Sequence, residues 1–231
     1  MKFLIGIFLL ISVSACGQEA PLISHFSVWK PKYGQTVNFE SGYKQHLLWH
    51  KANNDLWNWY GWFIISGPRD GMFIDATFNH SWHDFDLAKN PAGDGTDNQL
   101  HTEPFADFQK GYKLALLPFS DQPGKTSLQT RYARMLTIGL KDLTAATRQI
   151  ERVAKTYKQR NPGRPLLVFK MIDGGNTREI ILLMGLDSFA EYNKTQDLLD
   201  ELSKADERGQ TIKNVISETL LFKKDMSLNI D

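Results

Sequence analysis

The pattern of apolar and polar residues after residue 130 predicts six elements in the order strand, helix, strand, strand, helix, strand. The four strands are expected at Met135–Leu140, Leu166–Ile172, Glu179–Leu186 and Asn214–Met226. Residues 143–160 carry apolar side chains every three to four positions, which is typical of a helix with one buried face. A second helix is expected at Ser188, with Glu191 spaced for a capping box. This order is that of a ferredoxin-like βαββαβ unit.

The first half of the chain repeats this order at a constant offset of 107 residues. Residues 62–65 (WFII) pair with residues 169–172 (FKMI), and 112–118 pair with 219–225, without a gap. The chain therefore divides into a first repeat at 26–121, a linker at 122–130 and a second repeat at 131–231. Each repeat would form a four-stranded sheet that has helices on one face only, so its other face needs a partner.

This tandem arrangement resembles the dimeric α/β-barrel superfamily, here as a fusion of two modules in one chain. NIPSNAP-like proteins, antibiotic-biosynthesis-type monooxygenases, heme-degrading monooxygenases and chlorite-dismutase-like proteins share that plan. The resemblance implies an α+β fold in which two ferredoxin-like repeats pack sheet to sheet as a fused α/β barrel. It leaves the function open, because one fold carries several chemistries.

The start of the chain has the parts of a bacterial lipoprotein leader in the expected order. Lys2 precedes an apolar run at 3–13, and Val13-Ser14-Ala15-Cys16 follows it. This resembles a lipobox, which implies a signal peptide at 1–15, a lipid anchor on Cys16 and a tether at 16–25. A plain secretory signal is the alternative. Gly17 stands where an aspartate would favour the inner membrane, so the resemblance implies a lipid-anchored protein of the bacterial cell envelope, at the outer membrane.

Composition narrows the remaining possibilities. Cys16 is the only cysteine, so the mature chain has neither a disulfide nor a thiol nucleophile. The formal net charge is +1 with both signs mixed along the chain, which argues against a nucleic-acid partner. Phosphate-binding loops, dinucleotide fingerprints and paired-cysteine metal motifs are absent from the sequence. The oligomeric state does not follow from these features.

Tryptophan and histidine distinguish the two repeats. All six tryptophans and all six histidines lie between residues 25 and 101, and the second repeat has neither. Because both repeats need the same kind of core, this difference indicates that the first repeat carries the site and that the second is a scaffold. Chlorite-dismutase-like proteins ligate heme through a histidine of the C-terminal module, which this chain lacks.

His46 and His50 are the first candidate pair. At the offset of 107 they take the places of Val153 and Tyr157, so they lie on the face that the sister helix buries. Three interpretations remain open. The pair are core histidines bonded to backbone or to Asn53, Asn54 or Asp55; they bind a metal with Asp75, His80 or His83 as third ligand; or one of them ligates heme or acts as a general base.

The second hairpin of the first repeat supplies further candidates. Asp75, Thr77 and Asn79 alternate with apolar residues, whereas the sister strand is apolar on both faces. They either line a polar cavity, which the resemblance places inside the barrel with Trp62 as a wall, or form a solvated strand face. Ser81 and Asp84 are explained as a helix cap. The cap does not account for the neighbouring His80 and His83, which remain candidate ligand-binding residues.

Residues 89–103 replace a plainly helical segment of the second repeat. Pro91, Gly93 and Gly95 predict a long loop there. Such a loop would be a surface insertion, a lid over a cleft, or a cation site built from the acidic and histidine side chains of the segment. Those side chains are Asp94, Asp97, His101 and Glu103.

Three functions follow from these features. The first is a membrane-anchored lipoprotein that binds a small hydrophobic or aromatic ligand in its first repeat. The second is a monooxygenase or heme-handling enzyme in which His46, His50 or His83 is a ligand or base. The third is a non-catalytic interaction module whose aromatic residues are mostly core. Heme is the one cofactor that the resemblance suggests, and no catalytic residue is assigned.

Overall fold

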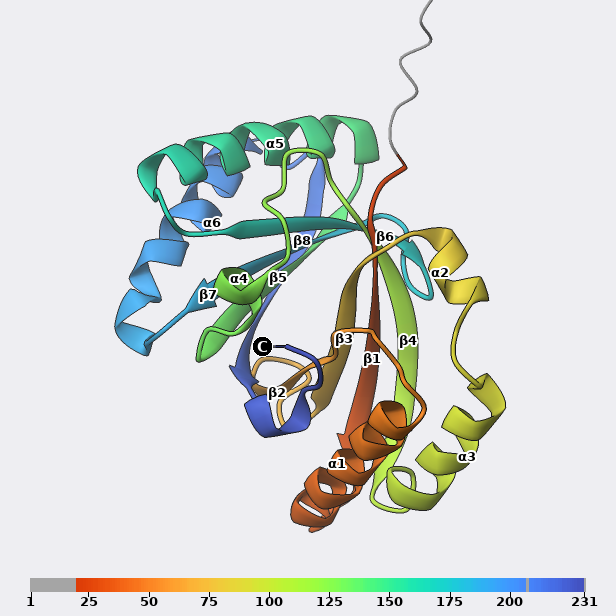
Figure 1. The fold of residues 1–231 in the computed structure, drawn as a ribbon. Helices are drawn as coiled ribbons and strands as arrows, with labels where there is room; N and C mark the ends of the chain where they lie inside the picture. The colour runs from red at the N-terminus through yellow and green to blue at the C-terminus, as the bar shows by residue number, and fades with distance from the viewer. Residues whose placement is uncertain (1–19, 207, 231) are drawn as a thin grey trace, which may run out of the picture.

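The computed structural model describes residues 20–206 and 208–230, so the expected leader and Cys16 lie outside the described residues. Eight antiparallel strands form a closed barrel in the order β1-β3-β2-β8-β5-β7-β6-β4 (Figure 1). The strands are β1 (Ile23–Pro31), β2 (Tyr60–Ser66), β3 (Phe73–His80), β4 (Ala106–Leu116), β5 (Tyr132–Leu140), β6 (Leu166–Asp173), β7 (Glu179–Leu186) and β8 (Ile212–Phe222). The predicted α+β fold of two ferredoxin-like repeats is confirmed.

Each repeat contributes four adjacent strands, and the two sets meet at both edges. Strand β2 pairs with β8, where Trp62 lies opposite Phe222. Strand β4 pairs with β6, where Leu116 lies opposite Phe169. Pairing at both seams leaves no open sheet edge, which removes the usual site of edge-to-edge aggregation. The first strand begins at Ile23, three residues before the expected start of the repeat.

The barrel interior is filled by aromatic and aliphatic side chains from both repeats. The ring of Phe26 stacks on Tyr112 with centroids 5.3 Å apart and meets Phe78 edge-on at 5.4 Å. Trp62 and Phe169 are also fully buried in this cluster. The interior is therefore a packed hydrophobic core, which supplies the main stabilisation of the fold.

Helices cover the outer faces of the barrel, except a short one at Lys125–Leu128 that packs Leu128 into the interior cluster (Figure 1). They are α1 (Thr36–Ala52), α2 (Trp82–Asp86), α3 (Pro91–His101), α4 (Lys125–Leu128), α5 (Leu143–Arg160) and α6 (Asn193–Ala205). In the second repeat, α5 and α6 pack on the sheet through aliphatic residues. In the first repeat, α1 packs Phe39, Tyr43 and Leu47 against Phe63 and Phe73, and α3 packs beside α1. Within the described residues, none of these helices has the length and apolar character needed to cross a membrane.

The loop predicted over residues 89–103 is wrong, because Pro91–His101 forms helix α3. Pro91 occupies the first helical position, where a missing N–H costs nothing. The side chain of Asn90 accepts a hydrogen bond from the Gly93 N–H at 3.1 Å and so caps the helix. A Cβ on Gly93 would lie 3.0 Å from the Trp49 ring, so this glycine permits close packing against α1. Residues that read as helix breakers here serve as helix-start and packing residues.

Two smaller predictions had opposite outcomes. Ser81 and Asp84 form the predicted capping box at the start of α2. Ser188 makes no cap, because the Glu191 carboxylate accepts from the Asp187 N–H at 2.8 Å and pairs with Arg164. A 3₁₀ turn therefore covers residues 189–191, and α6 starts only at Asn193.

Candidate functional site

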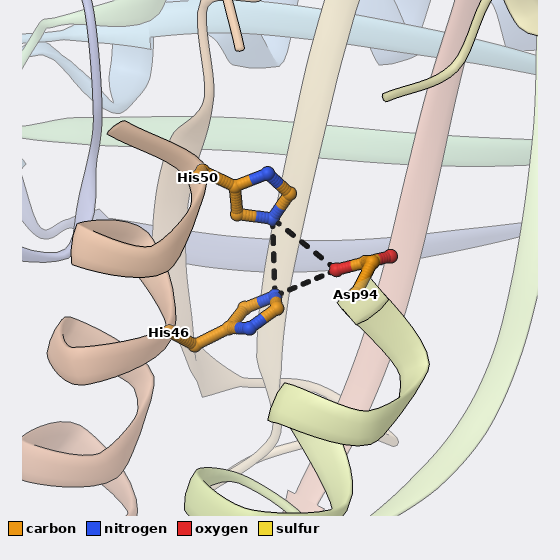
Figure 2. Close-up of side chains that lie close together, drawn as sticks. All are labelled: His46, His50 and Asp94. Atoms are coloured by element: carbon orange, nitrogen blue, oxygen red, sulfur yellow. Dashed lines mark hydrogen bonds and ion pairs between the residues drawn. The ribbon is translucent and has the colours of Figure 1, made fainter. Parts of the chain in front are cut away.

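His46 and His50 lie on the side of α1 that faces α3, and both side chains are buried. Their Nε2 atoms point toward each other at 3.1 Å (Figure 2). Asp94 reaches toward them from α3, with its Oδ1 atom 3.3 Å from Nε2 of His46 and 3.5 Å from Nε2 of His50. Two helices thus bring three potential metal-ligand atoms together at one point.

The other ring nitrogen of each histidine faces a second carboxylate. Nδ1 of His46 lies 2.8 Å from Oδ2 of Asp97, and Nδ1 of His50 lies 2.9 Å from Oδ2 of Asp55. Asp97 lies one helical turn after Asp94 on α3, and its second oxygen contacts Nδ1 of His101 at 3.0 Å. An ionised carboxylate accepts hydrogen bonds and cannot donate them. Each carboxylate therefore holds its histidine ring in one orientation through Nδ1.

Burial sets the charge state of this cluster. It lowers the pKa of His46, and the nearby His50 lowers it further, against the opposing effect of Asp97. Burial alone would raise the pKa of Asp55, but hydrogen bonds from His50, the Trp57 N–H and the Trp59 indole outweigh it and lower that pKa. Nδ1 of His46 thus faces Asp97, and its Nε2 faces His50 and Asp94.

A pocket of about 590 Å³ opens beside the histidine pair. Its walls are Trp57, Trp59 and Phe85, with Leu56 and Leu87 at the rim. Its polar lining consists of His25, His50, Asp55, Asp84, Lys89, Asp94 and Lys113. A volume of this size and an aromatic lining with a few polar groups are typical of small-molecule sites.

The aromatic walls are fixed by contacts behind them. The Trp59 indole N–H donates to Oδ2 of Asp55 at 2.9 Å, so the same carboxylate orients Trp59 and His50. The Trp57 ring lies 4.1 Å from the His80 ring and 5.4 Å from Phe85, measured between centroids. Nε2 of His80 is engaged by the Thr77 hydroxyl at 2.6 Å, and burial lowers the pKa of His80. These contacts hold the pocket in shape without a ligand.

The predicted polar cavity inside the barrel is wrong. Asp75 and Thr77 alternate with the interior residues of β3, so they face the helix layer. The Asp75 carboxylate accepts from the Trp29 indole at 3.0 Å, and burial raises its pKa to about 7. Trp62 is a barrel-core residue whose indole N–H finds no partner among the described residues. Asp75 and Thr77 thus form hydrogen bonds within the sheet, on the face that the helices cover, rather than lining a chamber.

The other sequence candidates lie apart from the histidine pair. The Asn79 amide donates to the Pro123 carbonyl at 3.3 Å, and its backbone φ of 66° ends β3. His83 is on the exposed side of α2, with 74% of its side chain accessible. The third atom of the cluster comes from none of the residues Asn79, His83, Asp75 and His80. That atom comes from Asp94, while Asn53 bonds the Trp49 carbonyl instead of a histidine.

Sequence reasoning named Asp94, Asp97 and His101 but placed them in a loop. At spacings of three and four residues they lie on one face of a helix, the face that meets α1. Reading 91–101 as a helix started by Pro91 would have aligned them with the histidine pair. The pocket residues Trp57, Phe85 and Lys113 carry no sequence signal, because only the fold brings their three segments together.

Comparison with known proteins supports the architecture. No protein-family model matches the sequence, and no curated protein matches it significantly. A solved structure provisionally assigned as a chlorite dismutase superposes with a TM-score of 0.60, covering 89% of this chain and 96% of that one at 12% identity. The chain has the dimeric α/β-barrel fold.

Two further solved structures agree with this α/β-barrel assignment. A protein of Fusobacterium nucleatum, provisionally assigned as a monooxygenase, gives a TM-score of 0.60 at 12% identity, with 90% and 94% coverage. A chlorite dismutase variant of Candidatus Nitrospira defluvii, solved with cyanide, gives 0.56 at 9% identity, with 90% and 93% coverage. Identities this low show a common fold and leave the activity to be argued from the site.

Proposed function

We propose that this α/β-barrel protein binds a small ligand with an apolar or aromatic body in the pocket beside α1. The observation that carries this proposal is the wall of Trp57, Trp59 and Phe85 around about 590 Å³. The second repeat has no tryptophan, and its corresponding helix face is packed with aliphatic residues and Tyr157. A planar apolar body suits the walls, and polar groups on it would meet Lys113 on one side or His50 and Asp94 on the other.

The proposal includes attachment to the bacterial envelope through lipid on Cys16. The pocket lining begins with His25, nine residues after that cysteine. Nine residues span at most about 32 Å when fully extended. An apolar ligand would therefore leave or enter the bilayer close to the pocket. Membrane fractionation tests the anchor: the native chain is expected with the outer membrane and a Cys16→Ser variant in the soluble fraction, and equal distribution of both would contradict it.

Ligand binding is tested with 2-naphthoate, a small aromatic anion, by quenching of tryptophan fluorescence. Trp57 and Trp59 report directly on the pocket. Phe85→Ala removes one wall, and an aromatic contact contributes about 0.5–1.5 kcal/mol, so affinity should fall about two- to twelvefold. Phe189→Ala is the control, because it removes the same side chain from the second repeat, away from the pocket, at a position more exposed than the half-buried Phe85. Unsaturable quenching, or equal affinity in both variants, would refute the proposal.

An enzyme related to the monooxygenases is the second candidate, and the observation that favours it is the polar edge of the pocket. His50 and Asp94 stand where a bound ligand would present its reactive end. Heme fits this site poorly. The Nε2 atoms of His46 and His50 point at each other and at Asp94 across 3.1–3.5 Å, which leaves no space for a porphyrin, and the barrel interior is filled by packed aromatic rings. Heme added to the protein should therefore give no sharp Soret band; a band lost in a His46→Val, His50→Tyr variant would reverse that conclusion.

A further inference from the structure

Three atoms of the histidine cluster have the mutual spacing of ligands around one cation. The pair of Nε2 atoms is 3.1 Å apart, and Oδ1 of Asp94 lies 3.3 Å and 3.5 Å from them. Donor atoms that each lie about 2.1 Å from a metal, at angles of about 95–115° to one another, are separated by about 3.1–3.5 Å. The three side chains converge from two helices on one point (Figure 2).

The hydrogen bonds around the cluster also call for a positive charge at its centre. Asp97 and Asp55 each face the Nδ1 atom of one ring, which places the ring proton there. In neutral rings both Nε2 atoms are then bare acceptors, and they face each other and a carboxylate oxygen. Three acceptors at these distances repel one another unless a cation lies between them. That cation is either a proton held by one ring or a metal ion.

The surroundings favour a metal. Metal-binding histidines typically donate their second N–H to a carboxylate, which orients the ring and makes it a stronger ligand. Both histidines here do so, and both carboxylates are fixed in turn. Asp97 is held by His101 at 3.0 Å, and Asp55 is held by the Trp59 indole at 2.9 Å.

We propose that His46, His50 and Asp94 bind one divalent transition-metal ion. Two imidazole nitrogens and one carboxylate oxygen are typical of zinc sites and of non-heme iron(II) sites, and such sites keep coordination positions open. Here the open side is the pocket, since His50 and Asp94 are among its lining residues and His46 is not. Water, or an oxygen of a bound ligand, would complete the coordination.

Calorimetric titration with Zn²⁺ tests the site on residues 17–231, which include every element of the closed barrel. After treatment with a chelator, the protein should bind one Zn²⁺ per chain. Asp94→Asn should weaken binding at least about tenfold, and His46→Val with His50→Tyr should abolish it. His83→Gln, which changes an exposed histidine, should bind as the native chain does. Circular dichroism verifies that each variant is folded.

Two results would overturn the proposal. Absence of Zn²⁺ and Co²⁺ binding to the native chain would leave the proton as the central cation. Binding that survives in the double variant would place the metal elsewhere. With Co²⁺ bound, the visible spectrum should show imidazole and oxygen ligation and should change in Asp94→Asn.

The inference that a bound ligand contacts the metal directly rests on the proposed function, and it has a separate test. Benzohydroxamate joins an aromatic ring to a metal-binding group, whereas acetohydroxamate has the group alone. The Co²⁺ spectrum should respond to benzohydroxamate at lower concentration, and Phe85→Ala should remove that difference. If Co²⁺ binds but the two hydroxamates act alike, the metal site stands and the aromatic pocket as a ligand site is refuted.

Discussion

Replacing the histidine pair by its counterparts in the sister helix is the most informative single perturbation. The change His46→Val with His50→Tyr copies Val153 and Tyr157, which are buried in α5. It removes two rings but leaves no buried carboxylate without a partner. Asp97 keeps His101, and Asp55 keeps the Trp59 indole and a backbone N–H. Asp94 has 38% of its side chain accessible and can be hydrated.

The size of the effect follows from these contacts. Each lost hydrogen bond between a ring and a carboxylate is worth about 1.5–3 kcal/mol. Burial of the new Val and Tyr side chains returns about 1.5–3 kcal/mol each. The free energy of unfolding of the metal-free protein should therefore change by less than about 3 kcal/mol. For a chain of this length, that corresponds to a Tm change of less than about 12 °C.

Zinc should raise the Tm of the native chain and leave the Tm of the double variant unchanged. At free Zn²⁺ of about one hundred times Kd, binding stabilises the native chain by about 2.7 kcal/mol. Its Tm should then rise by about 5–11 °C, while the Tm of the double variant should not move. Scanning calorimetry with and without Zn²⁺ measures both, with His83→Gln as the control.

This reasoning would be refuted in two ways. Equal zinc shifts in both proteins would show that the histidines are not the ligands. A loss of more than about 5 kcal/mol in the metal-free variant would show that the histidine–carboxylate contacts hold α1 to α3 and are needed for folding.

Four further changes test other parts of the structure. Burial raises the pKa of Asp75 from 3.8 to about 7, so its contribution to stability is present below pH 3.8 and is lost as the pH rises through 7. Asp75→Asn should accordingly be more stable relative to the native chain at pH 8 than at pH 5 in urea unfolding; the same difference at both pH values would refute this. Phe169→Ala should cost about 3–5 kcal/mol by leaving a cavity in the barrel core, and a loss below about 1 kcal/mol would show that the core collapses into it. Arg69→Met should cost about 3–5 kcal/mol, because it leaves the buried Glu218 carboxylate, which Arg69 contacts at 2.9 Å, without its cation; a neutral result would show that this ion pair does not stabilise the fold. Asp97→Asn should weaken Zn²⁺ binding about ten- to hundredfold in calorimetry, and unchanged affinity would show that this carboxylate does not support the metal.

Much of the architecture could be predicted from the sequence, because the buried faces of the barrel strands and of the helices determine where apolar residues recur. Helix 143–160 and strand 179–186 have the predicted bounds, and the sister elements of the first repeat follow at nearly the same offset. The closure of the barrel at β2–β8 and β4–β6 was not readable, since edge pairing depends on contacts between distant segments.

Only part of the candidate site could be predicted from the sequence. The offset between the repeats correctly placed His46 and His50 on a buried helix face. Asp55 was named among their partners and does contact His50. Asp94 and Asp97 were not placed beside the pair, because Pro91, Gly93 and Gly95 are read as helix breakers when their position within the helix is unknown. Asp75 and Thr77 were expected to line a polar cavity in the barrel or to form a solvated strand face. They are instead buried on the opposite face of β3 from Ile74 and Ala76. Alternation alone gives two faces and does not say which one is inside.

Anomalous diffraction from crystals of residues 17–231 grown with Co²⁺ or Zn²⁺ is the most direct test of the metal site. The account predicts one strong peak about 2.0–2.2 Å from Nε2 of His46, from Nε2 of His50 and from an oxygen of Asp94. The Asp97 and Asp55 carboxylates should still face the two Nδ1 atoms. A peak elsewhere, or none between α1 and α3 at saturating metal, would contradict the account.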